Sequence, residues 1–226
     1  MSLLLLCDLL RAFQQLAKGF EIPTPRGDSG KMAAVLFICS LFFLGALGSA
    51  PKPCTSPELL EGKKTVFDQS GEIEGGQFSY DAVQKRIFAF KVKYFSNGTT
   101  LQEMEFLLFQ ESVRYQFYPE SRKCVKSALR TPFQHIAVPS NATLIIQTYV
   151  GGSSDPQEGV LANIWNVETG DGVPYILTFT AYGCLPLSIN YYCKEKGWIV
   201  ESIYSLTTGI SDPSVFIPPA SCTQLN

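Results

Sequence analysis

The sequence is poor in the side chains that most enzymes use for catalysis. Histidine occurs once in 226 residues, as His135. A Ser-His-Asp triad would have to include this residue, and no Gly-x-Ser-x-Gly nucleophile motif accompanies it. Zinc and other transition metals need several histidine or cysteine ligands close together, and the cysteines are too widely spaced to supply them. The sequence therefore predicts a protein that is not an enzyme.

Other kinds of site are also missing. The chain has no stripe of basic residues, so nucleic acid is not an expected partner. Calcium stays open because acidic turns such as Asp171 and Asp212 could donate oxygens, but no Asp-x-Asp-x-Asp loop identifies its ligands. Glu103 and Glu105 would lie about 7 Å apart on one strand face, which is interpreted as a solvated surface and not as a glycosidase pair. Apart from calcium, no cofactor is expected.

The longest apolar run, residues 33–47, is shorter than the roughly 20 residues of a membrane-spanning helix. Its length is typical of a signal-peptide core, and residues 48–50 supply the small side chains that a signal peptidase recognises. The residues before Met32 are interpreted as an upstream extension. We expect residues 1–50 to be removed, with an uncleaved anchor as the alternative. Residues 51–226 should then form one secreted domain without a transmembrane segment.

Cysteines and glycosylation motifs agree with secretion. Five cysteines follow the signal peptide, at positions 54, 124, 184, 193 and 222. An oxidising secretory route favours two intramolecular disulfides and one remaining thiol, and the sequence alone leaves the pairing open. Asn97-Gly98-Thr99 and Asn141-Ala142-Thr143 are N-glycosylation motifs in segments with turn chemistry. We predict glycans on Asn97 and Asn141.

The hydrophobic pattern from Val66 onward has a period of two, which is typical of antiparallel strands. In Arg86–Tyr94, for example, alternate side chains are aromatic or β-branched. Only Pro57–Gly62 is compatible with a turn of helix. The predicted strands cover residues 77–81, 86–94, 101–110, 112–118, 144–150, 160–168, 175–182, 187–193 and 198–206. About ten strands favour an all-β sandwich, barrel or strongly curved sheet with little helix, and any of these can enclose a cavity.

Aromatic side chains are plentiful enough to line such a cavity, although a closed core would explain the same pattern. Alternation does not reveal which face of a strand meets the cavity. The candidate pocket residues are Phe88, Phe90, Tyr115, Phe117, Trp165 and Phe179.

The C-terminal third carries more specific motifs. Thr180-Ala-Tyr-Gly-Cys-Leu-Pro186, Asp212-Pro-Ser-Val-Phe-Ile-Pro-Pro219, a final Cys222 and the opening Pro51-Lys-Pro-Cys54 make the mature region similar to the ependymins and their mammalian relatives. This resemblance implies two curved antiparallel sheets around a hydrophobic pocket, as in bacterial lipoprotein carriers. It also implies a secreted, homodimeric glycoprotein, outside cells or in the lysosomal lumen.

The resemblance further implies the disulfides Cys54–Cys184 and Cys124–Cys222, and it leaves Cys193 unpaired or free for an interchain bond. A third bridge found in the mammalian relatives has no cysteines here. The expected function is binding of a lipid or other hydrophobic ligand, with calcium as a further ligand. The alternative is an extracellular matrix or cell-adhesion factor that acts through calcium and glycans, with roles in neural plasticity.

Overall fold

The computed structural model describes residues 50–155, 157–168 and 173–223, and the predicted signal peptide lies outside these ranges. The part from Pro51 onward is a compact unit by itself. Its strands are β1 (Leu59–Asp68), β2 (Ile73–Asp81), β3 (Arg86–Tyr94), β4 (Thr100–Leu108), β5 (Val113–Tyr118), β6 (Lys123–Ala128), β7 (Thr143–Gly151), β8 (Gly159–Glu168), β9 (Pro174–Thr180), β10 (Pro186–Cys193) and β11 (Gly197–Thr208). A 3-10 turn, η1 (Pro213–Phe216), and a short helix, α3 (Ala220–Thr223), follow.

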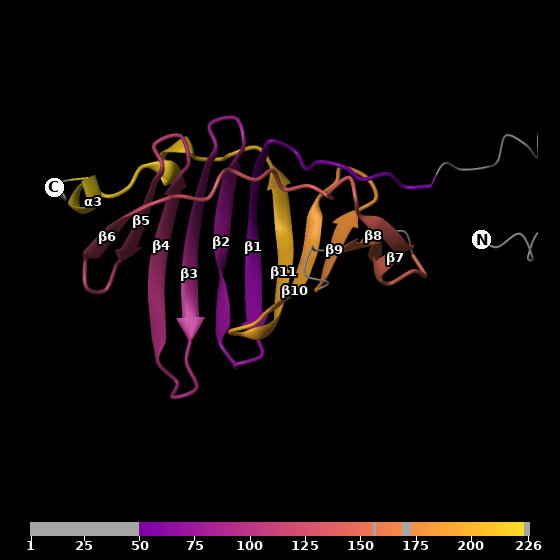
Figure 1. Cartoon of the computed structure of the whole chain (residues 1–226), viewed down its shortest axis with the longest axis horizontal. Coiled ribbons are helices and arrows are strands. Elements are labelled where there is room, and N and C mark those ends of the chain that lie inside the picture. Colours follow the sequence, from indigo (N-terminus) through magenta and orange to yellow (C-terminus); the bar gives the residue numbers. More distant parts are fainter. Residues whose placement is uncertain (1–49, 156, 169–172, 224–226) are drawn as a thin grey trace, which may run out of the picture. The chain divides into compact units, whose positions relative to one another are not determined.

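All eleven strands form one antiparallel sheet in the order β6-β5-β4-β3-β2-β1-β11-β10-β9-β8-β7 (Figure 1). The expectation of an all-β fold with little helix is confirmed, but the expectation of two sheets is wrong. Two hairpin series, β1–β6 and β7–β11, join because β1 pairs with β11 from Leu60↔Thr208 to Asp68↔Ile199. The alternation of side chains within each strand is the same whether the two series form two sheets or join into one. The sequence pattern therefore did not distinguish one sheet from two.

Two strands, β1 and β6, were not predicted from the sequence. The segment compatible with a helical turn, Pro57–Gly62, instead enters β1 at Leu59, because Leu60 is fully buried beside Tyr80 of the neighbouring strand. Sheet pairing overrides a weak local preference there. Strand β6 is a short edge strand with mostly exposed side chains, so it has little hydrophobic pattern to recognise.

Residues 129–142, which we call the strap, connect the two opposite edges of the sheet. Ten strand spacings of about 4.8 Å make the sheet roughly 48 Å wide along its surface, whereas a fully extended strap would reach only about 50 Å. The strap is not fully extended, since Ala142 N–H donates to Pro139 O in a turn. It therefore has to cross a curved sheet on its inner side, and Figure 1 shows it running across the strands.

The strap and the tail, residues 209–222, cover opposite faces of the sheet. On the strap face, Phe133 and Ile136 pack on a core that includes Leu60 and Tyr80. On the tail face, Phe216 packs between Phe88 and Phe106 in a separate core. Strand alternation separates the two faces: in β3 Ile87 and Ala89 belong to the strap face, and Phe88 and Phe90 to the tail face.

Candidate ligand-binding site

A cavity of about 250 Å³ opens on the strap face. Apolar side chains from β2, β3, β4, β10 and β11 form most of its lining, and the strap adds Ile136. Lysine and glutamate side chains form the rest. The lining residues are Phe78, Tyr80, Ile87, Ala89, Leu107, Ile136, Pro186, Ile189 and Ile203, with Lys64, Lys91, Glu105 and Glu201. Its volume is just below the roughly 300–1,000 Å³ of typical small-molecule sites, which suits one slender apolar chain.

Hydrogen bonds hold the strap over this cavity. Tyr80 is 1% exposed, and its hydroxyl oxygen accepts a hydrogen bond from the backbone N–H of Ile136 at 3.2 Å. Its ring also stacks on Phe133, with the ring centroids 5.7 Å apart. Ser56 N–H donates to Ile136 O at 2.9 Å, and Val138 N–H donates to Cys54 O at 2.8 Å. The N-terminal segment and the strap therefore act as one cover.

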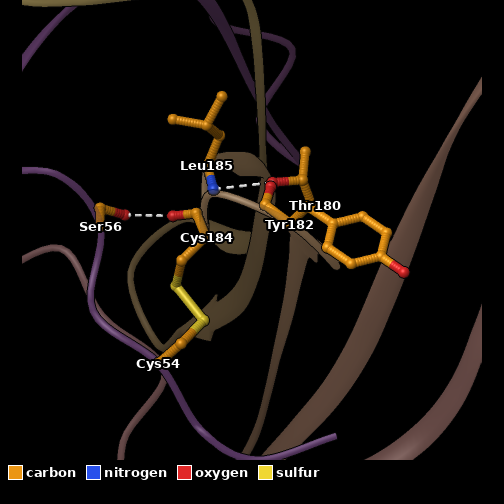
Figure 2. Close-up of a disulfide and its surroundings, with 6 residues drawn as sticks. All are labelled: Cys54, Ser56, Thr180, Tyr182, Cys184 and Leu185. Atoms are coloured by element: carbon orange, nitrogen blue, oxygen red, sulfur yellow. Dashed lines mark hydrogen bonds between the residues drawn. A yellow bond between two sulfur atoms is a disulfide. The ribbon is translucent and has the colours of Figure 1, made fainter.

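The Cys54–Cys184 disulfide ties this cover to the sheet (Figure 2). Cys184 lies in the turn between β9 and β10 and has a left-handed φ of 52°. The Thr180 side chain supports this turn by donating to Tyr182 O at 2.5 Å and accepting from Leu185 N–H at 2.9 Å. Ser56 Oγ donates to Cys184 O at 2.7 Å beside the bridge. The motif Thr180–Pro186, singled out in the sequence, thus forms the anchor of the cover.

Two ion pairs form the polar wall of the cavity. Lys64 Nζ lies 2.9 Å from Glu201 Oε1, and Lys91 Nζ lies 2.5 Å from Glu105 Oε2. The Glu105 side chain is only 10% exposed and also pairs with Arg114 at 2.5 Å. Burial pushes the pKa of Glu105 up, but the charges of Lys91 and Arg114 outweigh burial and hold that pKa below its usual value. Glu103 and Glu105, interpreted in the sequence as a solvated face, are instead buried, and Glu103 accepts a hydrogen bond from the Gln116 side chain.

The predicted pocket residues do not line this cavity. Phe88, Phe90, Tyr115 and Phe117 are on the tail face and belong to the core around Phe216. On that face Phe88 also lines a hollow of about 250 Å³, and Phe90 lines one of about 340 Å³. The remaining two, at positions 165 and 179, are on the strap face but in a neighbouring core around the disulfide. The cavity lies on the strap face of β2 and β3, which is the face opposite to Phe88 and Phe90. Lys91, which follows Ala89 by two residues on the same strand face, was the signal that could have located the cavity. A strand face that changes from apolar to charged suits the mouth of a cavity.

The cysteines pair as the resemblance implies, since the structure contains both Cys54–Cys184 and Cys124–Cys222, over sequence separations of 130 and 98 residues. Cys193 is the free cysteine within the described ranges. Its thiol donates to Glu195 Oε2 at 2.9 Å. The predicted interchain role of Cys193 remains a prediction.

The two predicted glycosylation sites are both exposed. Asn97 lies in the turn between β3 and β4, where its Oδ1 accepts hydrogen bonds from the N–H and hydroxyl of Thr99. Asn141 lies just before β7, and its Nδ2 is 3.5 Å from Glu168 O. Both side chains lie on turns, as the motifs suggest, and their glycosylation remains a prediction.

The remaining candidates have simple structural roles. His135 is exposed and touches Phe133 edge-on. Asp212 caps η1 by accepting hydrogen bonds from Ser214, and Asp171 lies outside the described residues. Within the described ranges, no three potential metal ligands cluster together, and none of the helices there is long and apolar enough to cross a membrane.

Comparison with known proteins identifies the family. The ependymin family model matches residues 97–222, more than half of the chain. The chain belongs to the ependymin family. It is 28% identical to Ependymin-2 of Carassius auratus, over 85% of this chain and 89% of that protein. It is also 29% identical to mammalian ependymin-related protein 1 of Mus musculus, over 83% of this chain and 84% of that protein. The resemblance drawn from the sequence motifs is thereby confirmed.

Solved structures are more distant from this family member. An uncharacterized conserved protein from Thermus thermophilus matches with a TM-score of 0.49 and 7% identity, covering 84% of this chain and 97% of that one. A putative outer membrane lipoprotein-sorting protein domain from Vibrio parahaemolyticus matches with a TM-score of 0.24 and 5% identity, covering 77% of this chain and 94% of that one. With TM-scores below 0.5, neither likeness bears on function, and the similarity to lipoprotein carriers remains a prediction.

Proposed function

We propose that this ependymin-family protein is a secreted glycoprotein that binds the apolar chain of a lipid or similar ligand and catalyses no reaction. The observation that carries the proposal is the apolar cavity under the strap. Its lining is contributed by six strands and the strap, so a bound chain would contact side chains from all of these elements. Burying apolar surface there would contribute roughly 25 cal/mol per Å².

The construction of the cover supports the same proposal. A cavity of this size with apolar walls costs stability, because its lining side chains lose packing partners. A disulfide and several hydrogen bonds nevertheless hold the strap and N-terminal segment over it. A bound hydrocarbon chain would restore the missing contacts.

Filling the cavity tests the proposal. Ala89 lines it and is 6% exposed, so Ala89→Phe should weaken binding of a fluorescent fatty-acid probe by about tenfold or more. Ala128→Phe adds the same side chain on exposed edge strand β6 and should leave the affinity unchanged. Equal affinity in the wild type and Ala89→Phe would rule out the cavity as the binding site. It would favour the alternative of an adhesion factor acting through calcium and glycans.

We also propose that the protein is a homodimer that associates through the uncovered part of the tail face. Exposed apolar side chains of β1, β2, β3, β10 and β11 lie on that face, each 39–48% exposed: Phe67, Ile73, Tyr94, Tyr192, Trp198, Val200 and Tyr204. An apolar band of this kind is typical of a surface buried by association. Val200→Lys should shift the sedimentation coefficient to that of a monomer, and an unchanged dimer would place the interface elsewhere.

A further inference from the structure

The charged side chains that line the cavity lie toward the end that points away from the strap. On β3, Ile87 pairs with Tyr80, the residue whose hydroxyl holds the strap. Along the same face, Ile87 is followed by Ala89 and then by Lys91. Strand β11 runs antiparallel to β1 and changes in the same direction across the sheet, from an apolar lining residue to Glu201. A bound amphiphile would therefore place its apolar chain beside the strap and its polar end among the charges.

The four charged lining residues neutralise each other in two pairs. Lys64 on β1 pairs with Glu201 on the adjacent strand β11. Lys91 on β3 pairs with Glu105 on the adjacent strand β4. Burial lowers the pKa of Lys91, but the carboxylate of Glu105 outweighs burial and holds that pKa above its usual value, so this pair stays ionised. Because no other charged residue of the described chain lines the cavity, its wall has no net charge.

A charged head group would disturb this balance. An anion would lie beside the carboxylates of Glu105 and Glu201, whose lysine partners are already engaged, and a cation would lie beside the lysines. The side chains of Glu105 and Glu201 are only 10% and 18% exposed, so water screens an added charge incompletely. Burying an uncompensated charge costs far more than burying a neutral polar group that is hydrogen-bonded. The cavity therefore disfavours head groups of either sign.

A pure hydrocarbon would leave hydrogen-bonding capacity unused at the same end. Lys64 Nζ donates one hydrogen bond, to Glu201 Oε1 at 2.9 Å, whereas an ammonium group can donate three. The other carboxylate oxygen of Glu201 accepts no hydrogen bond from the described residues. A hydroxyl group can accept from the lysine and donate to the carboxylate at the same time, without separating the pair.

We propose that the cavity selects an uncharged, single-chain amphiphile with a hydroxyl-bearing head group, such as a monoacylglycerol, an inference that rests on the proposed function. The hydrocarbon chain lies beside the strap, and a head-group hydroxyl binds at the Lys64–Glu201 pair. Selectivity against fatty-acid anions and alkylammonium ions comes from charges that are already paired.

Titration calorimetry with three amphiphiles of equal chain length tests the inference. Monodecanoylglycerol, decanoate and decylamine are each added to the secreted protein at neutral pH, below their critical micelle concentrations. Monodecanoylglycerol should bind about tenfold tighter than either ion. Equal or tighter binding of decanoate or decylamine would overturn the inference and leave the proposed function standing. If none of the three binds, the proposed function itself fails.

Reversal of the preference gives the sharper test. Glu201→Gln leaves Lys64 without its partner, so decanoate should bind about tenfold tighter than it binds the wild type. Monodecanoylglycerol, which reports an intact cavity, should bind with nearly the same affinity as before. The double variant Lys64→Gln/Glu201→Gln restores a neutral wall and should disfavour decanoate again.

A matched control separates charge balance from a structural role of the pair. Glu120→Gln makes the same change in the exposed β5–β6 turn and should leave all three affinities unchanged. If Glu201→Gln leaves decanoate binding unchanged, or weakens all three ligands together, paired charges do not set the ligand preference and the inference is wrong.

Discussion

The two faces of the sheet are covered in similar ways with different results. On each face a segment without strands crosses the sheet and is fixed by a disulfide, Cys54–Cys184 on the strap face and Cys124–Cys222 on the tail face. The strap leaves a cavity of about 250 Å³ beneath it. The tail places Phe216, which is 3% exposed, directly on Phe88 and Phe106. The tail also borders a hollow of about 250 Å³, to which Ser211 and Val215 contribute, but most of the side chains that line it are polar. The comparison indicates that the apolar lining, and not the presence of a hollow, makes the strap face suitable for a hydrocarbon chain.

Removing each disulfide gives the largest expected effect. Chain entropy predicts about 4–5 kcal/mol of stability from either bridge, since the closed loops are of similar length. Replacing Cys54 and Cys184 by serine should lower the free energy of unfolding and also weaken probe binding. Replacing Cys124 and Cys222 should cost similar stability with less effect on binding. Urea unfolding and probe titration measure the two effects, and equal losses of binding would show that the faces are not functionally distinct.

The aromatic core under the tail should give the next largest effect on stability. Phe216→Ala should lower the free energy of unfolding by about 3–4 kcal/mol, because the ring contacts a buried aromatic core and lies 4.2 Å under the Arg86 guanidinium. Ile217→Ala is the control, since Ile217 is 68% exposed, and should change stability by about 0.5 kcal/mol or less. Probe affinity should be the same in both variants. A strong loss of binding in Phe216→Ala would mean that the tail face contributes to the site.

A smaller change, at the contact between β2 and the strap, should affect the retention of ligand as well as stability, in contrast to Phe216→Ala. Tyr80→Phe removes the hydroxyl oxygen that accepts from Ile136 N–H and should cost about 1–3 kcal/mol. Because this bond holds the strap over the cavity, probe dissociation measured by stopped flow should also become faster. Tyr182→Phe, at a residue 81% exposed, serves as the control. Unchanged dissociation in Tyr80→Phe would contradict a role of the strap in retaining ligand.

The polar wall should give the smallest effect, seen as a pH dependence. The pKa of Glu105 is lower in the folded protein than its ordinary value of 4.5, so this carboxylate stabilises the fold above that pH. This contribution should be lost as the pH falls through 4.5 and then through the folded-state pKa. Glu105→Gln should therefore show a shallower acid loss of stability in urea titrations at several pH values. Equal slopes would mean that Glu105 is not stabilised by Lys91 and Arg114.

The sequence was informative where local pattern determines structure. Alternation located most strands, and specific motifs near Cys184 and Cys222 led to the family. The sequence did not show which face of each strand lies under the strap and which under the tail. Ala89 was therefore overlooked, and Phe88 lines a hollow beside the tail and not the cavity under the strap. That choice depends on the strap and tail, whose paths over the sheet follow from long-range pairing of β1 with β11 and not from any local periodicity.

Native mass spectrometry of the protein secreted from animal cells, with its glycans trimmed, tests most directly whether the strap face binds lipid. We predict discrete adducts of lipid mass that disappear on denaturation and are depleted in Ala89→Phe but not in Ala128→Phe. A protein that is ligand-free in its native form, or adducts that persist equally in Ala89→Phe, would contradict lipid binding in this cavity.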